Sequence, residues 1–157
     1  MKERTRKQSR AFSLLEVVIV VAIIAILAAI GIPRLSRGSK GANDAALSGN
    51  LTVLRNAIDL FAAEHTGAYP TAADIAKQLT QYTNAAGDVS ASKVNPYIYG
   101  PYLRSIPPLP VGPRKGGTII AATDANDVGW IYGATTGKIT ANTTTEKDEA
   151  DKLYLDY

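Results

Sequence analysis

The stretch Phe12–Ile32, FSLLEVVIVVAIIAILAAIGI, contains one charged residue, Glu16, and is followed by Pro33. Its length suits one helical crossing of a bilayer, which takes about 20 residues. A carboxylate in hydrocarbon costs roughly 2.5 kcal/mol or more on insertion scales, so Glu16 indicates a task beyond anchoring. No Lys, Arg or His lies between Phe12 and Pro33. The balancing cation must therefore come from another chain or from a new amino terminus.

Charge is distributed unevenly along the chain. Residues 1–11 carry five basic residues and one acidic residue, while the rest of the sequence holds 12 basic and 13 acidic residues. The net charge of +3 therefore arises in the first segment. Because no basic stripe remains in the body, the sequence argues against nucleic-acid binding. Basic residues before an apolar run favour an amino terminus that stays in the cytoplasm.

The composition leaves little material for catalysis. The sequence has no cysteine and one histidine. Disulfides and thiolate metal sites are therefore ruled out, and histidine-based triads have almost no residues to draw on. The sequence also lacks a P-loop, a glycine-rich dinucleotide turn and an HExxH motif. We therefore expect neither an enzyme nor a bound cofactor.

Residues 1–33 allow three interpretations. A secretory signal peptide has an apolar region of 7–15 residues before a small-residue cleavage site. This run is longer, although Ala25, Ala28 and Ala29 offer such a site. A plain single-pass anchor leaves Glu16 unexplained. The third interpretation is a prepilin leader.

The string from Arg10 to Val17, RAFSLLEV, resembles the cleavage and methylation motif of type IV pilins and type II secretion pseudopilins. A basic leader, a small residue, Phe, Glu at a fixed offset and an apolar run coincide in it. The resemblance implies that prepilin peptidase cuts between Ala11 and Phe12 and then methylates Phe12. Ala11 stands where the family usually has Gly, and we expect processing because Ala is also small.

The resemblance also supplies a cation for Glu16. Cleavage creates an amine at Phe12, about 6 Å from Glu16 along a helix axis. In the family, the glutamate of one subunit is thought to neutralise the amine of a neighbour during filament growth, which makes Glu16 the assembly residue. A desolvated pair of this kind favours correct register more than stability. The alternative is that Glu16 extends its carboxylate to the lipid headgroups.

Pro33 matches a helix-loosening proline of the family, and its missing backbone donor predicts a kink. Beyond it, apolar residues recur with a helical spacing of four and three. They are Leu47, Leu51, Leu54, Ile58, Phe61 and Ala62. On other faces, Arg55 and Asp59 can form an ion pair. Gly67 predicts the helix end, and we expect His65 at the surface, where it offsets the helix dipole.

The segment after this helix predicts a small head. Thr71 can cap a helix over 72–82, and six prolines make residues 83–116 loop-like. Three tyrosines in this loop are expected to pin it to the core, and they are Tyr97, Tyr99 and Tyr102. Short strands are predicted at Thr118–Ala122, Val128–Tyr132 and Lys138–Ala141. Residues 152–156 add a strand, or the acidic stretch 146–151 forms a frayed tail.

Three head motifs also carry the resemblance. GWIYGATTGKITAN, residues 129–142, resembles a hairpin of many pilin-like heads. YPT at 69–71 and GPYLRSIP at 100–107 are similar to segments of the major pseudopilin of type II secretion. The predicted fold is α+β and pilin-like, with a long N-terminal helix packed on a small antiparallel sheet. Its parts are a basic leader (1–11), a transmembrane or filament-core helix (12–33) and a globular head (34–157).

The resemblance implies a structural subunit of a type II secretion pseudopilus. Such a subunit sits in the bacterial inner membrane with its head in the periplasm, and then enters a periplasmic or extracellular filament. Its implied partners are sister subunits, prepilin peptidase, an assembly ATPase, an inner-membrane platform, minor pseudopilins and, before assembly, membrane lipid. The alternatives are a major pilin of a type IV pilus and a membrane-tethered periplasmic binding module.

Calcium is the one metal that the sequence raises. Asp124 and Asp127 offer oxygen ligands, and major pseudopilins commonly hold calcium in a C-terminal loop. The sequence pattern of that loop is not evident in this chain. Turn formation is the simpler role for both residues, and no ligands are assigned.

Overall fold

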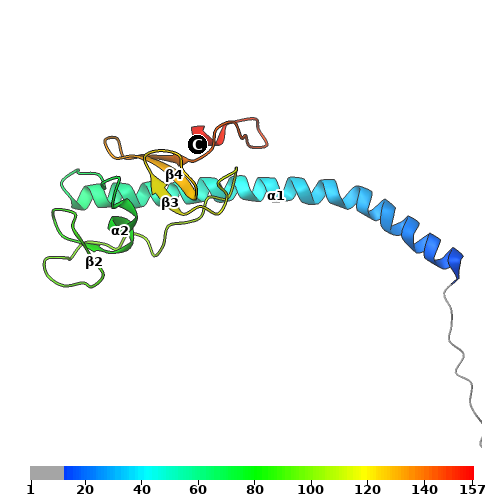
Figure 1. The fold of residues 1–157 in the computed structure, drawn as a ribbon, viewed down its shortest axis with the longest axis horizontal. Helices are drawn as coiled ribbons and strands as arrows, with labels where there is room; N and C mark the ends of the chain where they lie inside the picture. The colour runs from blue at the N-terminus through cyan, green and yellow to red at the C-terminus, as the bar shows by residue number, and fades with distance from the viewer. Residues whose placement is uncertain (1–12) are drawn as a thin grey trace, which may run out of the picture. The chain divides into compact units, whose positions relative to one another are not determined.

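The computed structural model describes residues 13–157, with the backbone alone for residues 31–37. The predicted leader, Ala11 and Phe12 therefore lie outside the described residues. The chain divides into two compact units, Met1–Ser39 and Lys40–Tyr157. Along the chain the elements (Figure 1) are α1 (Leu14–Glu64), α2 (Ile75–Thr80), β1 (Tyr82–Thr83), β2 (Val89–Ser90), β3 (Ile119–Ala121), β4 (Val128–Gly133), β5 (Lys138–Ala141) and the 3-10 turn η1 (Tyr154–Asp156).

Helix α1 contributes to both units, and its first part buries nothing. Every Val, Ile and Leu side chain from Leu14 to Ile30 is at least half exposed. This segment is apolar all round, so a partner surface that covered one face would leave the other apolar faces exposed. Among the residues that the structure describes, no helix combines the length and apolar character needed to cross a membrane. The membrane segment predicted at 12–33 includes residues outside the described ones and stays a prediction.

The second part of α1 is the spine of the other unit. All six apolar residues with the predicted helical spacing are buried there. They pack with the sheet, whose largest core side chains are Trp130, Tyr132 and Ile139, and Figure 1 shows β3 and β4 beside this part of α1. A long helix packed on small sheets is the predicted α+β, pilin-like arrangement, which is confirmed.

The predicted pairing of Arg55 with Asp59 is wrong. The guanidinium Nη2 of Arg55 instead donates to the backbone oxygen of Tyr157 at 2.8 Å and, more weakly, to that of Ile139 at 3.4 Å. Asp59 forms no ion pair within the described part of the chain. Arg55 is drawn inward because the outer edge of β5 leaves a carbonyl without a strand partner.

The predicted end of α1 is confirmed, but the predicted role of His65 is wrong. The helix ends at Glu64, and Gly67 has a φ of 87° while its N–H donates to the Ala62 carbonyl at 2.8 Å. His65 is only 3% exposed and stacks on the Phe61 ring at 3.8 Å between centroids. Its Nε2 lies 3.1 Å from the Thr83 hydroxyl, so His65 joins the helix end to β1.

The second helix is shorter than predicted. α2 begins at Ile75 and ends at Thr80, within the predicted range 72–82. The N-cap position is Asp74 rather than the predicted Thr71, whose hydroxyl instead accepts the Asp74 N–H at 3.2 Å in the turn before the helix. Tyr82, predicted as its last residue, begins β1, which pairs antiparallel with β2. The buried Gln78 side chain stabilises this region by accepting from the Thr71 N–H and donating to the Gly87 carbonyl, both at 2.8 Å.

The three predicted strands are confirmed, but one predicted pairing is wrong. Strand order is β3-β4-β5, with β4–β5 antiparallel and β3–β4 parallel, so the sheet is mixed. Neighbouring parallel strands usually need a connection of a dozen or more residues. β3 has three residues and spans only about 10 Å, so the short segment 122–127 can return the chain to its start. Asp127 helps this return with a φ of 64°.

The β4–β5 hairpin carries the centre of the core. Trp130 is fully buried, and its indole N–H donates to the Pro107 carbonyl at 2.8 Å. The hairpin turn closes through the Gly137 N–H, which donates to the Gly133 carbonyl at 2.9 Å. The close approach of Gly129 to the Gly117 carbonyl leaves no room for a Cβ atom. Glycine is therefore required at Gly129.

The loop and the C-terminal segment are both tied to the core. Tyr102 donates its hydroxyl to Glu64 at 2.6 Å, and Tyr99 packs against His65 at 5.1 Å between ring centroids. These contacts agree with the predicted pinning role for Tyr99 and Tyr102, whereas Tyr97 bridges to Val94 within the loop. Residues 152–156 form no full strand, and the acidic stretch 146–151 is not a frayed tail, because Asp148 is buried and hydrogen-bonded there. Residues 152–156 pass through one isolated bridge between Lys147 and Leu153 and then form η1, in which Tyr154 is buried.

Candidate functional site: the exposed apolar part of helix α1

The candidate site is the start of α1, where one carboxylate stands among exposed apolar side chains. The helix begins at Leu14, and the Val17 N–H donates to the Ser13 carbonyl at 3.2 Å. Glu16 lies in the first turn and is exposed. A negative charge is favourable there, because the unpaired N–H groups of a helix start carry partial positive charge.

Exposure is greatest near the start of this helix. Leu14 is 82% exposed and Leu15 is 66% exposed, and Ile30 at the far end is still 57% exposed. Monomeric soluble proteins rarely expose apolar patches of this extent, so such a surface marks contact with protein or lipid. We therefore expect protein or lipid to cover this segment on all sides.

Glu16 also borders a small groove on this surface. The groove has a volume of about 330 Å³ and is lined by Glu16, Val17, Val20 and Val21. Among the described residues, its lining is apolar apart from the carboxylate. An incoming helix that fills it would bring its own side chains beside Glu16, and a cation there would offset the cost of desolvating the carboxylate.

The other predicted site residues stand as follows. Ala11 and Phe12, the predicted cleavage and methylation residues, lie outside the described residues. Pro33 lies inside α1, which is assigned as helix on both sides of it. The predicted kink at Pro33 stays a prediction.

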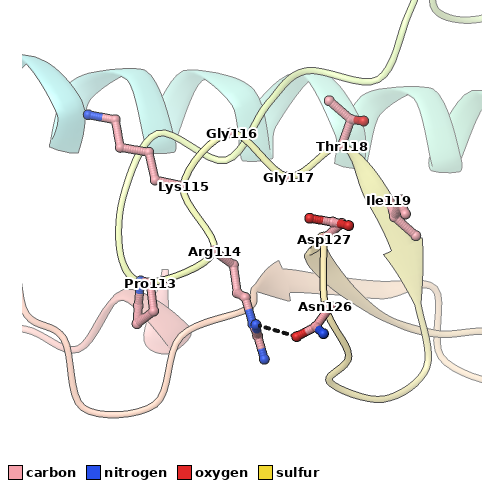
Figure 2. A pocket seen from close by; sticks show the side chains of 9 residues that line it. All are labelled: Pro113, Arg114, Lys115, Gly116, Gly117, Thr118, Ile119, Asn126 and Asp127. Carbon is pink, nitrogen blue, oxygen red and sulfur yellow. Dashed lines mark hydrogen bonds between the residues drawn. The ribbon is translucent and has the colours of Figure 1, made fainter.

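A second concave region lies beside β3 and is shown in Figure 2. It encloses about 690 Å³ between the loop Pro113–Thr118 and the residues Asn126 and Asp127. The Arg114 guanidinium forms an ion pair with the Asp124 carboxylate at 3.1 Å and donates to the Asn126 amide oxygen at 3.2 Å. Of the two basic residues in its lining, Arg114 and Lys115, Arg114 is thus already held by a neighbouring loop.

The aspartates considered for calcium are both used in the turn before β4. Asp124 accepts hydrogen bonds from the side chains of Asn142, at 2.8 Å, and of Arg114. These bonds, that of Asn142 first, hold the pKa of Asp124 below its ordinary value. Within the described range, no three His, Cys, Asp or Glu side chains gather in a way that could hold a metal ion.

Sequence reasoning missed the residues that tie the C-terminal segment to α1. The helical spacing of apolar residues did not single out Asp44, yet this carboxylate accepts the Tyr154 hydroxyl at 2.6 Å. A signal was present, because Asp44 precedes Leu47 by three residues and Leu51 by seven and so shares their buried face. Asp148, in the acidic stretch, is buried and accepts the Tyr157 hydroxyl at 2.5 Å.

Comparison with known families gives one match. Residues 6–32 match the prokaryotic N-terminal methylation motif. No curated protein and no solved structure matches the chain. The motif supports the type IV pilin-like family and indicates a structural subunit.

The matched motif and the geometry define a class of protein. The motif implies processing by prepilin peptidase and polymerisation into a filament, and it suggests a membrane-anchored precursor. The exposed apolar side chains from Leu14 to Ile30 all lie within the matched residues, as does Glu16 in the first turn of the helix. The chain therefore carries the features of a pilin-type structural subunit.

Proposed function

We propose that this chain is a structural subunit of a type II secretion pseudopilus, similar to the major pseudopilin. In this proposal, prepilin peptidase removes residues 1–11 and methylates Phe12, and the processed chain polymerises from the inner membrane with its head in the periplasm. The observation that carries the proposal is Glu16, an exposed carboxylate on an otherwise apolar and exposed stretch of helix that lies within the matched methylation motif.

The free energy of burial explains why polymerisation suits this helix. The twelve exposed Val, Ile and Leu side chains between Leu14 and Ile30 each gain about 1.5–3 kcal/mol on full burial. Their total, roughly 20 kcal/mol or more by the same scale, makes transfer of the helix into water prohibitive. The helix can leave lipid only for an equally apolar bundle of sister helices. An assembly ATPase and an inner-membrane platform would drive that transfer.

Glu16 would select the register of the bundle. After cleavage, the amine of Phe12 on one subunit is the cation that Glu16 of a neighbour requires. A misplaced neighbour leaves the carboxylate unpaired in an apolar surrounding, which costs several kcal/mol, roughly 3–5 when one member of a buried pair is missing. Correct register is thereby favoured over other alignments of two apolar helices.

Features of the head support a pseudopilus over a type IV pilus. The head has no cysteine pair to close a C-terminal loop, and it carries YPT and GPYLRSIP. Minor pseudopilins would be further partners at the filament tip. A gene deletion distinguishes the two filaments. Loss of protein secretion with surface pili retained supports the pseudopilus, whereas loss of surface pili with secretion retained supports a type IV pilus.

The first test is the intact mass of the chain extracted from membranes. We expect the loss of residues 1–11 and the addition of one methyl group at Phe12. A full-length, unmethylated chain would contradict the proposal and favour a membrane-tethered binding module.

The second test neutralises the carboxylate. Glu16→Gln keeps the size of the side chain but removes the charge, so we expect a loss of about tenfold or more in filament yield, the equivalent of 1.4 kcal/mol, as counted in electron micrographs. Asp59→Asn is the matched control, because it neutralises an exposed carboxylate elsewhere on α1. Equal filament yields for both variants and the parent chain would exclude the charge pairing.

A further inference from the structure

The C-terminal segment, residues 146–157, is hydrogen-bonded to helix α1 at the start of the second unit. The Tyr154 hydroxyl donates to Asp44 Oδ1 at 2.6 Å, and the Glu149 N–H donates to Asp44 Oδ2 at 3.3 Å. On the preceding helical turn, Lys40 Nζ donates to the Asp148 carbonyl at 3.2 Å. Both oxygens of one helix carboxylate are thus bound by a segment more than 100 residues later in the chain.

A second carboxylate closes the segment on itself. Asp148 Oδ1 accepts the N–H groups of Ala150 and Lys152, each at 2.8 Å, and Oδ2 accepts the Tyr157 hydroxyl at 2.5 Å. The Asp148 N–H in turn donates to the Lys152 carbonyl at 2.9 Å. The conformation of the loop therefore depends on Asp148 being an acceptor at both oxygens.

The aromatic rings of the segment link these two carboxylates to the core. Tyr154 is 5% exposed and packs in the main apolar cluster, with the Tyr157 ring 6.0 Å away between centroids. Lys152 Nζ lies 4.3 Å above the Tyr157 ring, and Arg55 binds the backbone oxygen of Tyr157 at 2.8 Å. The segment is thus attached to α1 by a few polar contacts around two phenols.

We propose that residues 146–157 form a clasp on α1, held closed by two tyrosine–carboxylate hydrogen bonds and opened by acid. The closed clasp covers the helix at Lys40–Asp44. Protonation of Asp148 removes the charge that makes its hydrogen bond with the Tyr157 hydroxyl strong, since bonds to ionised groups are about twice as strong as neutral ones. The clasp lies wholly in the second unit and does not depend on the proposed function.

The direction of the acid effect follows from all the groups that face the clasp. From α1 these are Lys40, Asp44 and Arg55, and from the segment itself Glu146, Lys147, Asp148, Glu149, Asp151, Lys152, Tyr154, Asp156 and Tyr157. The Tyr157 hydroxyl, with the backbone N–H groups of Lys152 and Ala150, lowers the pKa of Asp148 from 3.8. A lowered pKa means that Asp148 stabilises the closed clasp above that value and stops doing so as the pH falls through the folded-state pKa.

Hydrogen exchange of the full chain in detergent micelles tests the clasp. The reporter amides are those of Asp148 and Tyr154, which donate to Lys152 and Glu146 within the segment. The reference amide is that of Thr83, which donates to Tyr99 in the other part of the head. In Tyr154→Phe at pH 7 we expect exchange of the reporters to rise about ten- to hundredfold, as for loss of a hydrogen bond to a charged group. The Thr83 amide should not change.

Tyr82→Phe is the matched control, because it removes a tyrosine hydroxyl outside the clasp. In this variant we expect the exchange of the Asp148 and Tyr154 amides to stay as in the parent chain. Reporter exchange that is unchanged in Tyr154→Phe, or that rises equally at Thr83, overturns the clasp. A double-mutant cycle with Asp44→Ala separates direct coupling from general loosening. The double variant should exchange no faster than the faster single variant, and additive effects would show that Tyr154 and Asp44 act independently.

Acid opening has its own measurement. Between pH 7 and pH 3, the protection of the reporter amides relative to Thr83 should fall in the parent chain. A constant ratio would overturn release by acid. These outcomes concern the second unit alone, so the intact mass and filament yield that test the proposed function are decided separately.

Discussion

Both parts of α1 carry large apolar side chains, but those from Leu14 to Ile30 are exposed and those on one face from Leu47 to Ala62 are buried. Ile23 is 52% exposed and Ile58 is fully buried, although both lie in one continuous helix. Around Ile23 the apolar residues occupy every face, whereas around Ile58 they occupy one. A helix with one apolar face is satisfied by a sheet of its own chain, while a helix that is apolar all round needs lipid or several other helices. The periodicity of the apolar residues, more than their hydrophobicity, therefore distinguishes the buried part of α1 from the exposed part.

The largest expected effect comes from making the same substitution in both parts. Ile58→Ala removes buried methyl groups and should lower the free energy of unfolding of the head by about 2–5 kcal/mol. Ile23→Ala should leave that free energy unchanged within about 0.5 kcal/mol, as for exposed sites. Denaturant unfolding of the detergent-solubilised chain, followed by Trp130 fluorescence, measures both. Equal destabilisation by the two variants would mean that the first part of α1 is packed by the head.

Glycine substitutions give a smaller effect, with opposite signs at two positions. Gly129→Ala places a Cβ atom against the Gly117 carbonyl and should cost about 1–3 kcal/mol through overpacking. Gly49 is exposed within α1, and its Cβ would meet nothing within 4 Å. Gly49→Ala should therefore stabilise the helix by up to about 1 kcal/mol. The same unfolding experiment applies, and a destabilising Gly49→Ala would reveal a close contact at that helix face.

The smallest expected effect is a change of stability with pH in the β3–β4 turn. The Asn142 amide and then Arg114 lower the pKa of Asp124 from 3.8. Its stabilisation is therefore present above that value and is lost as the pH falls through the folded-state pKa. Asp124→Asn should lower stability at pH 7 and show a weaker acid dependence than the parent chain. Unfolding midpoints at pH 7 and pH 3 measure this, and identical acid dependence in both chains would show that Asp124 does not contribute.

Some elements could be predicted because their signal is local in the sequence. The buried face from Leu47 to Ala62 follows from spacing alone, and the end of α1 follows from Gly67, whose φ of 87° suits glycine. The β4–β5 hairpin follows from two β-rich runs and a glycine-bounded turn. The start of the candidate site follows from Glu16 in an uncharged run.

Other features depended on contacts between distant residues. His65 is buried because β1 brings Thr83 to its ring, and Asp44 is partly buried because Tyr154 returns to it from a distant part of the chain. The parallel pairing of β3 with β4 depends on how short β3 is, which strand propensity does not set. In each case a side chain whose local sequence suggests solvent is held by a partner that only folding brings near.

The sequence by itself determined that this chain has an apolar helix with one carboxylate, a second helical part with one buried face and a small β-rich head, because periodicity and composition are local properties. Only the tertiary structure decided where the polar side chains of the head point, which strands run parallel and how the C-terminal segment fastens to α1. The physical reason is that hydrogen bonds of buried groups must be satisfied by whichever partners the complete fold brings within reach.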